Sequence, residues 1–283
     1  MIDLHVHTCY SDGEHTPCEI IELAKKHNLD TIAITDHDRV GGVKEAIEEG
    51  NKVGIYVIPG IEVTAFDEVE VHVLGYNIDV DSPELLSYIE TVKTKQEKEI
   101  SEIFCYLNSI DIKLEKDDVY KFRDGEFVTM WHFAKAIAEK GYALDVRDAI
   151  DRFFLKTSLK ERKNDRISVK DAINIIKASD GVPVLAHPVR LELSFDRIIE
   201  KIIKWKEYGL AGLEAIYSLN SEVDTKRYLK LAEDYELTVT MGSDYHGEHV
   251  KPNIKMGEKI NGVLTRMTLI DLNSNNDKVR IEN

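Results

Sequence analysis

Two histidines near the start of the chain, His5 and His7, have the spacing of a metal-binding pair. Residues at positions i and i+2 of a strand point to the same face, so both imidazoles can bind one cation. Asp12 follows five residues after His7 and offers a carboxylate to the same region. The alternative is a pair of histidines that only fills a core, and the nearby acidic side chain disfavours it.

Two further candidates come directly after apolar runs. His37 stands between Asp36 and Asp38, after the run at residues 31–35. Functional groups of barrel enzymes lie at such strand ends, so we expect His37 to be a ligand. The two aspartates are expected to support ligands or to cap a helix. Glu62 follows the next apolar run, and a carboxylate at this place can bridge two cations.

The second half of the chain repeats this arrangement. His187 follows the apolar run at residues 182–186, and Asp244 and His246 share one strand face at i, i+2 spacing. In the first half of the chain, one further histidine, His72, lies inside an apolar strand pattern, where a single histidine is more often structural.

Nine candidate ligands result, and they are six histidines, two aspartates and one glutamate. A mixed set of imidazoles and carboxylates suits zinc, manganese or iron rather than calcium or a metal selected by thiolates. With one bridging carboxylate, nine side chains fill three sites. The predicted metal ligands are His5, His7, Asp12, His37, Glu62, His72, His187, Asp244 and His246.

The elements that must position these residues alternate between strand-like and helical patterns. This alternation is typical of an α/β fold with a mainly parallel sheet. About seven short apolar runs favour a closed or nearly closed barrel over an open sheet. The predicted strands are residues 4–6, 31–35, 56–61, 69–76, 182–186, 213–216 and 238–241, with the fourth forming a hairpin with the third.

Residues 83–164 have helical patterns and no convincing strand. Ser82 has the type of an N-cap and Pro83 that of a first helical residue, and a long amphipathic pattern follows them. We therefore expect an inserted helical subdomain that caps the substrate. It would separate the two parts of a metal-binding barrel, residues 1–82 and 165–283.

The charge of the chain limits its partners. Its 283 residues include 37 Lys and Arg against 52 Asp and Glu, which gives a formal charge of −15. An acidic surface repels nucleic acids and anionic membranes, so we expect neither a long nucleic acid over the general surface nor a membrane as partner. Residues 156–166 hold five basic and two acidic side chains. This segment is either a solvated loop or a guide for an anionic substrate.

The cysteines and the N-terminus favour a cytoplasmic location. The three cysteines make an odd number without a C-x-x-C pair, so a disulfide framework is not expected. The first residues have neither a basic nor an apolar signal-peptide region, and no apolar run has the ~18 residues of a membrane span. The sequence gives no indication of the oligomeric state.

The motifs HxH with a following Asp, TDH, PGIE, a single His, AHP and GSDxH resemble, in this order, the PHP (polymerase and histidinol phosphatase) family. The resemblance covers residues 1–80 and 165–260. The helical insertion is similar to that of the branch with nucleoside 3′,5′-bisphosphate phosphatases, AMP phosphatase-like enzymes and RNA 5′-end exonucleases. The resemblance implies a distorted (β/α)7 barrel with two or three divalent cations at the C-terminal ends of the strands.

Carried over to this sequence, the resemblance implies three ligand sets that share Glu62. They are His5, His7, Glu62 and Asp244; Glu62, His72 and His187; and Asp12, His37 and His246.

The resemblance implies a metal-dependent phosphoesterase that hydrolyses a small phosphomonoester, a nucleotide such as AMP or a nucleoside 3′,5′-bisphosphate. A water that bridges the cations would be ionised near neutral pH and would attack phosphorus. Glu62, Asp244 and His246 are the expected catalytic residues. The alternatives are a cyclic phosphate phosphodiesterase, a non-catalytic metal-bound scaffold, and a hydrolase of C–N bonds built on a similar barrel.

One segment departs from the pattern of this branch. Its members commonly carry a Gly-Arg-Pro-His-like motif, whereas residues 129–132 are Thr-Met-Trp-His. Met130 therefore stands where an arginine would hold a second phosphate. We expect His132, Arg166 and Arg190 to bind the substrate, and surface salt bridges are the alternative for the two arginines.

Overall fold

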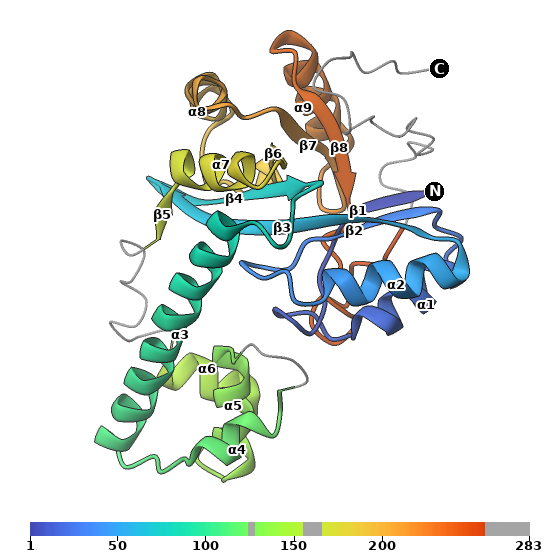
Figure 1. Ribbon diagram of the computed structural model, residues 1–283. Helices are drawn as coiled ribbons and strands as arrows, with labels where there is room; N and C mark the ends of the chain where they lie inside the picture. Colours follow the sequence, from blue (N-terminus) through green and yellow to red (C-terminus); the bar gives the residue numbers. More distant parts are fainter. Residues whose placement is uncertain (124–127, 155–165, 258–283) are drawn as a thin grey trace. The chain divides into compact units, whose positions relative to one another are not determined.

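The computed structural model describes residues 1–123, 128–154 and 166–257 (Figure 1). The chain divides into two compact units, residues 1–86 with 166–283, and residues 87–165. We call the first the barrel unit and the second the helical unit. Within the described residues, no helix combines the length and the apolar character needed to cross a membrane.

The barrel unit is built on one sheet with the strand order β1-β2-β3-β4-β6-β7-β8. Neighbouring strands are parallel except at β4, which is antiparallel to both β3 and β6. The strands are β1 (Ile2–Val6), β2 (Thr31–Ile34), β3 (Tyr56–Asp67), β4 (Val69–Tyr76), β6 (Val182–Leu185), β7 (Gly212–Tyr217) and β8 (Thr238–Gly242), with the short β5 (Ile167–Ser168) beside β3.

The sheet curves until its first and last strands meet. Val6 and Tyr245 form an isolated parallel bridge. The His7 N–H donates to the Tyr245 carbonyl at 2.9 Å, and the Asp244 N–H donates to the His5 carbonyl at 2.9 Å. The prediction of a nearly closed α/β barrel with seven main strands and helices is therefore confirmed.

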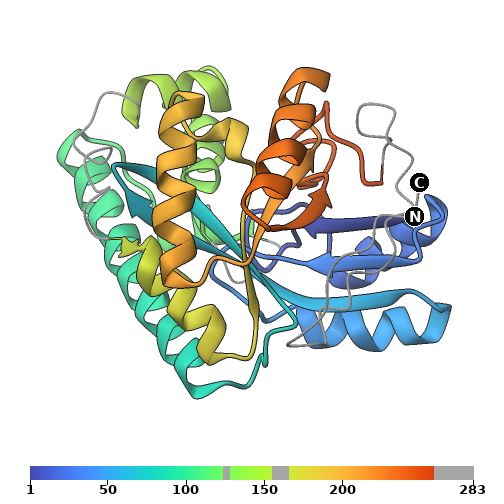
Figure 2. The same cartoon turned by 90° about the horizontal axis from the view of Figure 1, so that it is seen from above.

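Helices of the barrel unit lie outside the sheet. In Figure 1, α1 and α2 lie beside β1 and β2, and α7, α8 and α9 lie on the opposite side of the sheet; Figure 2 shows the same elements from above. The start of α1 is fixed locally, because Thr16 and Glu19 form a capping box and Pro17 is the first helical residue. The helices are α1 (Pro17–Lys26), α2 (Val43–Val53), α7 (Val169–Ala178), α8 (Phe195–Tyr208) and α9 (Glu222–Asp234), with a 3-10 turn, η2, at Pro188–Arg190.

One strand is longer than predicted. We expected the third strand to end at Ile61, but β3 continues to Asp67. The reason is its hairpin with β4, which pairs Gly60 with Tyr76 and then continues in register to Asp67 and Val69. This hydrogen-bonded ladder outweighs the tendency of Pro59 and Gly60 to end a strand.

The helical unit has its own apolar core. Its described residues contain helices and no strand, as the sequence predicted for this region. Leu107, Val119, Phe133 and Ile137 are fully buried there, and the Phe104 and Phe133 rings meet edge to face at 4.9 Å. The helices are α3 (Pro83–Ser109), which begins in the barrel unit, α4 (Lys116–Tyr120), α5 (Met130–Glu139) and α6 (Val146–Phe153).

A buried tyrosine connects two strands inside the barrel unit. Tyr76 on β4 has no exposed surface, and its hydroxyl donates to the Leu4 carbonyl on β1 at 2.9 Å. Burial, together with the nearby Glu214 and Glu62 carboxylates, raises the pKa of Tyr76 well above its ordinary value, so the hydroxyl keeps its proton. The ring fills the interior, and the hydroxyl satisfies a backbone acceptor.

The two parts of this side chain should contribute different amounts to stability. Tyr76→Phe removes one hydrogen bond and should lower the free energy of unfolding by about 0.5–1.5 kcal/mol. Tyr76→Ala leaves a cavity and should lower it by about 3–5 kcal/mol. Urea denaturation of both variants beside the wild type measures these differences. Equal losses in the two variants would show that the ring does not support the barrel.

Candidate metal centre

The structure brings all nine predicted ligands together in the barrel unit. His5 is in β1, and His7 and Asp12 follow this strand. His37 follows β2, Glu62 and His72 lie on the β3–β4 hairpin, His187 follows β6, and Asp244 and His246 follow β8. Since β1, β2, β6 and β8 run parallel along the sheet or across its closure, their C-terminal ends meet at one end of the barrel.

Four buried side chains form the first group of possible ligands, His5, His7, Glu62 and Asp244. The Nε2 atoms of His5 and His7 each lie 3.2 Å from Oε2 of Glu62. Oδ1 of Asp244 lies 3.4 Å from Nε2 of His7. This group is the same as the first set implied by the family resemblance.

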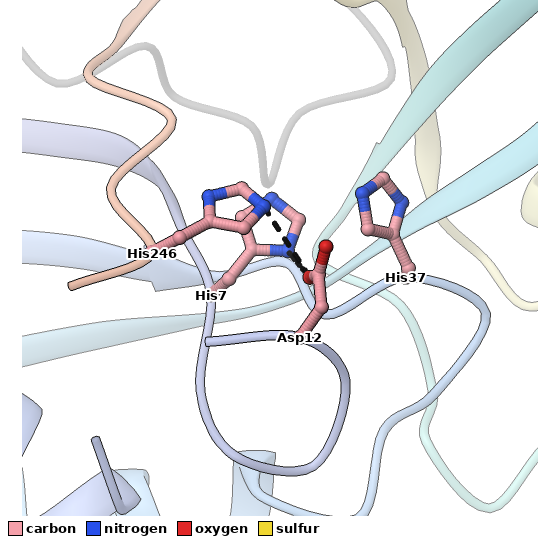
Figure 3. A group of neighbouring side chains, drawn as sticks. All are labelled: His7, Asp12, His37 and His246. Carbon is pink, nitrogen blue, oxygen red and sulfur yellow. Dashed lines mark ion pairs between the residues drawn. The ribbon is translucent and has the colours of Figure 1, made fainter. Parts of the chain in front are cut away.

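A second group contains His7, Asp12, His37 and His246. Figure 3 shows the Asp12 carboxylate between His37 on one side and the His7 and His246 rings on the other. Oδ1 of Asp12 lies 3.3 Å from Nε2 of His246 and 3.6 Å from Nδ1 of His7. His7 therefore directs one ring nitrogen to the first group and the other to the second group. The family resemblance implied Asp12, His37 and His246 for the second set, without His7.

The remaining ligands surround Glu62. Nδ1 of His72 and Nε2 of His187 lie 2.9 and 3.0 Å from its Oε1 atom, as the second implied set requires. Nδ1 of His37 lies 3.1 Å from its Oε2 atom, so His37 also groups with Glu62 and His72. Glu62 thus presents each of its oxygens to a different set of imidazoles.

The donor atoms fit divalent cations. Nε2 of His5 and Nε2 of His7 approach each other to 3.1 Å, although a pair of ring nitrogens can share only one proton in a hydrogen bond. Oε2 of Glu62, Nδ1 of His37 and Nδ1 of His187 are buried without a hydrogen-bond partner. Such atoms are costly unless something satisfies them, and a cation between nitrogen and carboxylate oxygen does so.

The carboxylates of the centre are held in their charged form. Burial penalises that form, yet the surrounding imidazoles hold the pKa of Glu62, Asp12 and Asp244 below the ordinary range. The imidazoles respond differently to their surroundings. Burial acts against the charge on His7, but the nearby Asp244, Glu62 and Asp12 carboxylates raise the pKa of His7 to about 9, whereas burial lowers the pKa of His37 to about 3. Metal ligation needs ionised carboxylates, and the centre provides them.

A fully buried glutamate that the sequence analysis did not identify supports two of the ligands. Oε1 of Glu214 lies 2.9 Å from Nδ1 of His5, and its Oε2 accepts the His187 backbone N–H at 2.7 Å. A proton on Nδ1 of His5 leaves Nε2 to face the centre. The backbone of Gly242 lies so close to His5 that a Cβ atom at residue 242 would lie 2.2 Å from the Cβ atom of His5. The only signal in the sequence was an acidic residue inside the apolar run of β7.

Asp36 holds the loop that carries Asp12. It accepts hydrogen bonds from the Thr8 N–H at 2.8 Å and from the Thr8 and Ser11 hydroxyls at 2.6 Å. Asp38 accepts from the Thr64 N–H at 2.9 Å. Both aspartates thus bind backbone or hydroxyl groups, and Asp36 supports the loop of a ligand as expected.

The three predicted substrate-binding residues lie in different surroundings. Nη1 of Arg190 lies 3.2 Å from Oδ2 of Asp244, next to the centre. Arg166 forms an ion pair with Glu70. His132 belongs to the helical unit, where its Nδ1 accepts the Thr129 N–H at 2.8 Å in the capping box of α5.

Two other residues beside Asp244 were not predicted. The Tyr217 hydroxyl donates to Oδ2 of Asp244 at 2.9 Å, and Nζ of Lys251 donates to the same oxygen at 2.8 Å. Neither residue belongs to a motif, so no sequence signal identifies them. The basic segment at residues 156–166 lies outside the described residues, except for Arg166.

Glu214 should contribute to metal affinity without touching the metal. Glu214→Gln weakens the acceptors for His5 and His187, and outer-shell changes of this kind typically cost about 10- to 100-fold in affinity. Equilibrium dialysis against manganese measures the effect, with Glu207→Gln on the exposed surface of α8 as the control. Wild-type affinity in Glu214→Gln would contradict the supporting role.

Comparison with known proteins agrees with this geometry. The PHP domain family matches residues 3–121. The chain is 28% identical to the 5′-3′ exoribonuclease Rnm of Escherichia coli, over 91% of this chain and 88% of that protein. It is 28% identical to the 3′,5′-nucleoside bisphosphate phosphatase of Chromobacterium violaceum, over 87% of each.

A solved structure covers still more of the chain. A structure described as a metal-dependent phosphoesterase from Bifidobacterium adolescentis is 30% identical, covers 92% of both chains and superposes with a TM-score of 0.78. The similarity therefore extends through the whole arrangement of strands that carries the nine ligands. The chain belongs to the PHP family, and it is a metal-dependent hydrolase of phosphoric esters.

Proposed function

We propose that this chain hydrolyses a small phosphomonoester, a nucleotide such as AMP or a nucleoside 3′,5′-bisphosphate. The burial of the ligand atoms carries this proposal. His5, His7 and Glu62 have no exposed surface, and Asp244 and His246 are about 1% exposed. A terminal phosphate group can enter such a centre more easily than a phosphodiester in the middle of a chain. The relatives named above act, by their names, on RNA and on a nucleoside bisphosphate.

The proposal includes two or three cations, manganese, iron or zinc, held by the nine predicted ligands. Such cations supply positive charge that stabilises the transferring phosphoryl group and activates water for the attack. They also explain how a protein with a formal charge of −15 binds a dianion, because charges at contact distance dominate the local field.

The chain's own residues hold the centre in one arrangement. Glu62 presents one oxygen to His72 and His187 and the other to His5, His7 and His37, so in our proposal it connects the sites. Nδ1 of His246 lies 2.9 Å from the Asp244 carbonyl, and a proton there leaves Nε2 directed at Asp12. Asp244 presents Oδ1 to the imidazoles while its Oδ2 is held by side chains from β7 and from the segments after β6 and β8.

We also propose that the insertion at residues 83–164 selects the substrate. Thr129 caps α5, and the side chains of the first turn, Met130 and Trp131, remain 45% and 40% exposed. His132 is partly occupied by the capping box, so it is less suited to bind a phosphate than the motif position implied. The absence of an arginine at residue 130 favours a substrate with one phosphate.

Asp244 provides the direct test of the proposed reaction. Asp244→Ala removes a ligand of the first group, and phosphate release from 5′-AMP by the manganese-loaded protein should fall by about 10³-fold or more. Asp234→Ala, on the exposed end of α9, is the control, and circular dichroism verifies that both variants are folded. Wild-type turnover in Asp244→Ala would contradict the assignment of this site.

Chromatography of the reaction products distinguishes the substrate classes, because phosphomonoesters release inorganic phosphate whereas a cyclic phosphate or an RNA chain yields nucleoside monophosphates. Adenosine 3′,5′-bisphosphate, 2′,3′-cyclic AMP and a 5′-phosphorylated RNA oligonucleotide are offered beside 5′-AMP. A preference for the cyclic compound or the oligonucleotide would replace the proposed substrate. Absence of any hydrolysis product from all four would contradict the proposed function.

Met130 tests the role of the insertion. Met130→Arg restores the cation of the family motif and should increase the preference for adenosine 3′,5′-bisphosphate over 5′-AMP by about 10-fold, the effect of one charged hydrogen bond. Leu144→Arg adds the same charge at a residue of the helical unit that is 93% exposed, and it should leave the preference unchanged. Equal effects of the two variants would indicate only a general change in charge.

A further inference from the structure

Three donors meet at a single oxygen on the outer side of Asp244. The Tyr217 hydroxyl, Nζ of Lys251 and Nη1 of Arg190 lie 2.9, 2.8 and 3.2 Å from Oδ2. The other oxygen, Oδ1, faces His7 at 3.4 Å. A carboxylate oxygen has two lone pairs, so three donors exceed what Oδ2 can accept in good geometry.

The charges of these side chains are not balanced either. Lys251 and Arg190 bring two positive charges to one negative charge, so the cluster has a net charge of +1 in an acidic protein. A lysine has three N–H donors and an arginine has five. Asp244 engages one donor of each, and Arg190 also contacts the neighbouring Tyr217. Asp244 therefore uses only a small part of their donor capacity.

The side chains of Arg190 and Lys251 are accessible to solvent, whereas the Asp244 carboxylate that both contact is not. The side chains of Arg190 and Lys251 are 48% and 24% exposed, whereas that of Asp244 is 2% exposed. Arg190 lies in η2 after β6, Tyr217 ends β7, and Lys251 follows β8. Three consecutive parallel strands thus direct their ends to one side of the metal centre.

Arg166, another predicted substrate residue, has a different environment. It pairs with Glu70, whose carboxylate also lies 3.1 Å from Nε2 of His72. One cation there matches one carboxylate, so this pair has no net charge. Of these two places, only the cluster of Lys251, Arg190 and Asp244 has more positive than negative charge.

We propose that Lys251 and Arg190, together with the Tyr217 hydroxyl, form an anion subsite for the phosphoryl oxygens of the substrate. The subsite favours a phosphomonoester dianion over a phosphodiester monoanion, because each cation gains more from the higher charge. This inference rests on the proposed function and adds a residue, Lys251, that no motif includes.

The substrate preference of Lys251→Met tests the inference. The values of kcat/KM for p-nitrophenyl phosphate and bis(p-nitrophenyl) phosphate are compared in the manganese-loaded protein. The monoester value should fall by about 10- to 100-fold, mainly through KM, and the diester value by clearly less. Lys251→Arg should restore most of the monoester activity. Lys255→Met, an exposed lysine four residues later, should change neither value.

Two measurements without turnover separate the subsite from a purely structural role. The manganese content of Lys251→Met should equal that of the wild type, because Asp244 keeps Arg190 and Tyr217 as partners. Calorimetric titration with inorganic phosphate should show an affinity reduced by the same factor as the monoester kcat/KM. Loss of manganese, or unchanged phosphate affinity, would overturn the inference.

The result also distinguishes this inference from the proposed function. A wild type that cleaves 5′-AMP, together with a Lys251→Met variant of unchanged KM and phosphate affinity, refutes the subsite alone. If the wild type cleaves no phosphomonoester, the proposed function fails. The phosphate titrations of wild type and variant then still decide whether Lys251 binds the anion.

Discussion

The metal centre depends on the complete burial of one carboxylate. Glu62 has no exposed surface, and its two oxygens lie within 3.2 Å of ring nitrogens from five histidines. A buried carboxylate is stable only where positive charge or hydrogen-bond donors surround it. The strands that carry these histidines must therefore reach the same point, and the closure of the barrel between β1 and β8 allows this.

Much of the centre could be predicted because its ligands follow local rules. Residues at i, i+2 on a strand share a face, and polar residues after apolar runs mark strand ends, so His5, His7 and His187 were identified. Glu214 depends on a contact between distant segments instead, and Lys251 reaches Asp244, seven positions earlier, only through the path of an irregular loop. Glu214 reaches His5 across 209 positions of sequence, and Lys251 lies in an irregular segment after β8. No periodicity within either segment indicates these contacts.

The division into two units separates reactivity from selectivity in our interpretation. The helical unit has an independent core around Phe133 and Ile137, and the barrel unit contains all nine ligands. Met130 and Trp131, on the first turn of α5, belong to the helical unit, whereas Glu62 belongs to the barrel unit. In our proposal, the same chemistry persists while the surface of the insertion changes, and the departure from the family motif at residues 129–132 is such a change.

The meeting of β1 and β8 has a consequence for the order of assembly. The first group of ligands combines His5 and His7, at the start of the chain, with Asp244, more than two hundred residues later. A ribosome-bound chain cannot complete this group before Asp244 has emerged, and contacts of such sequence separation form late in folding. A chain truncated before Asp244 would therefore keep His37, Glu62 and His72 but would lack one of the four ligands of the first group.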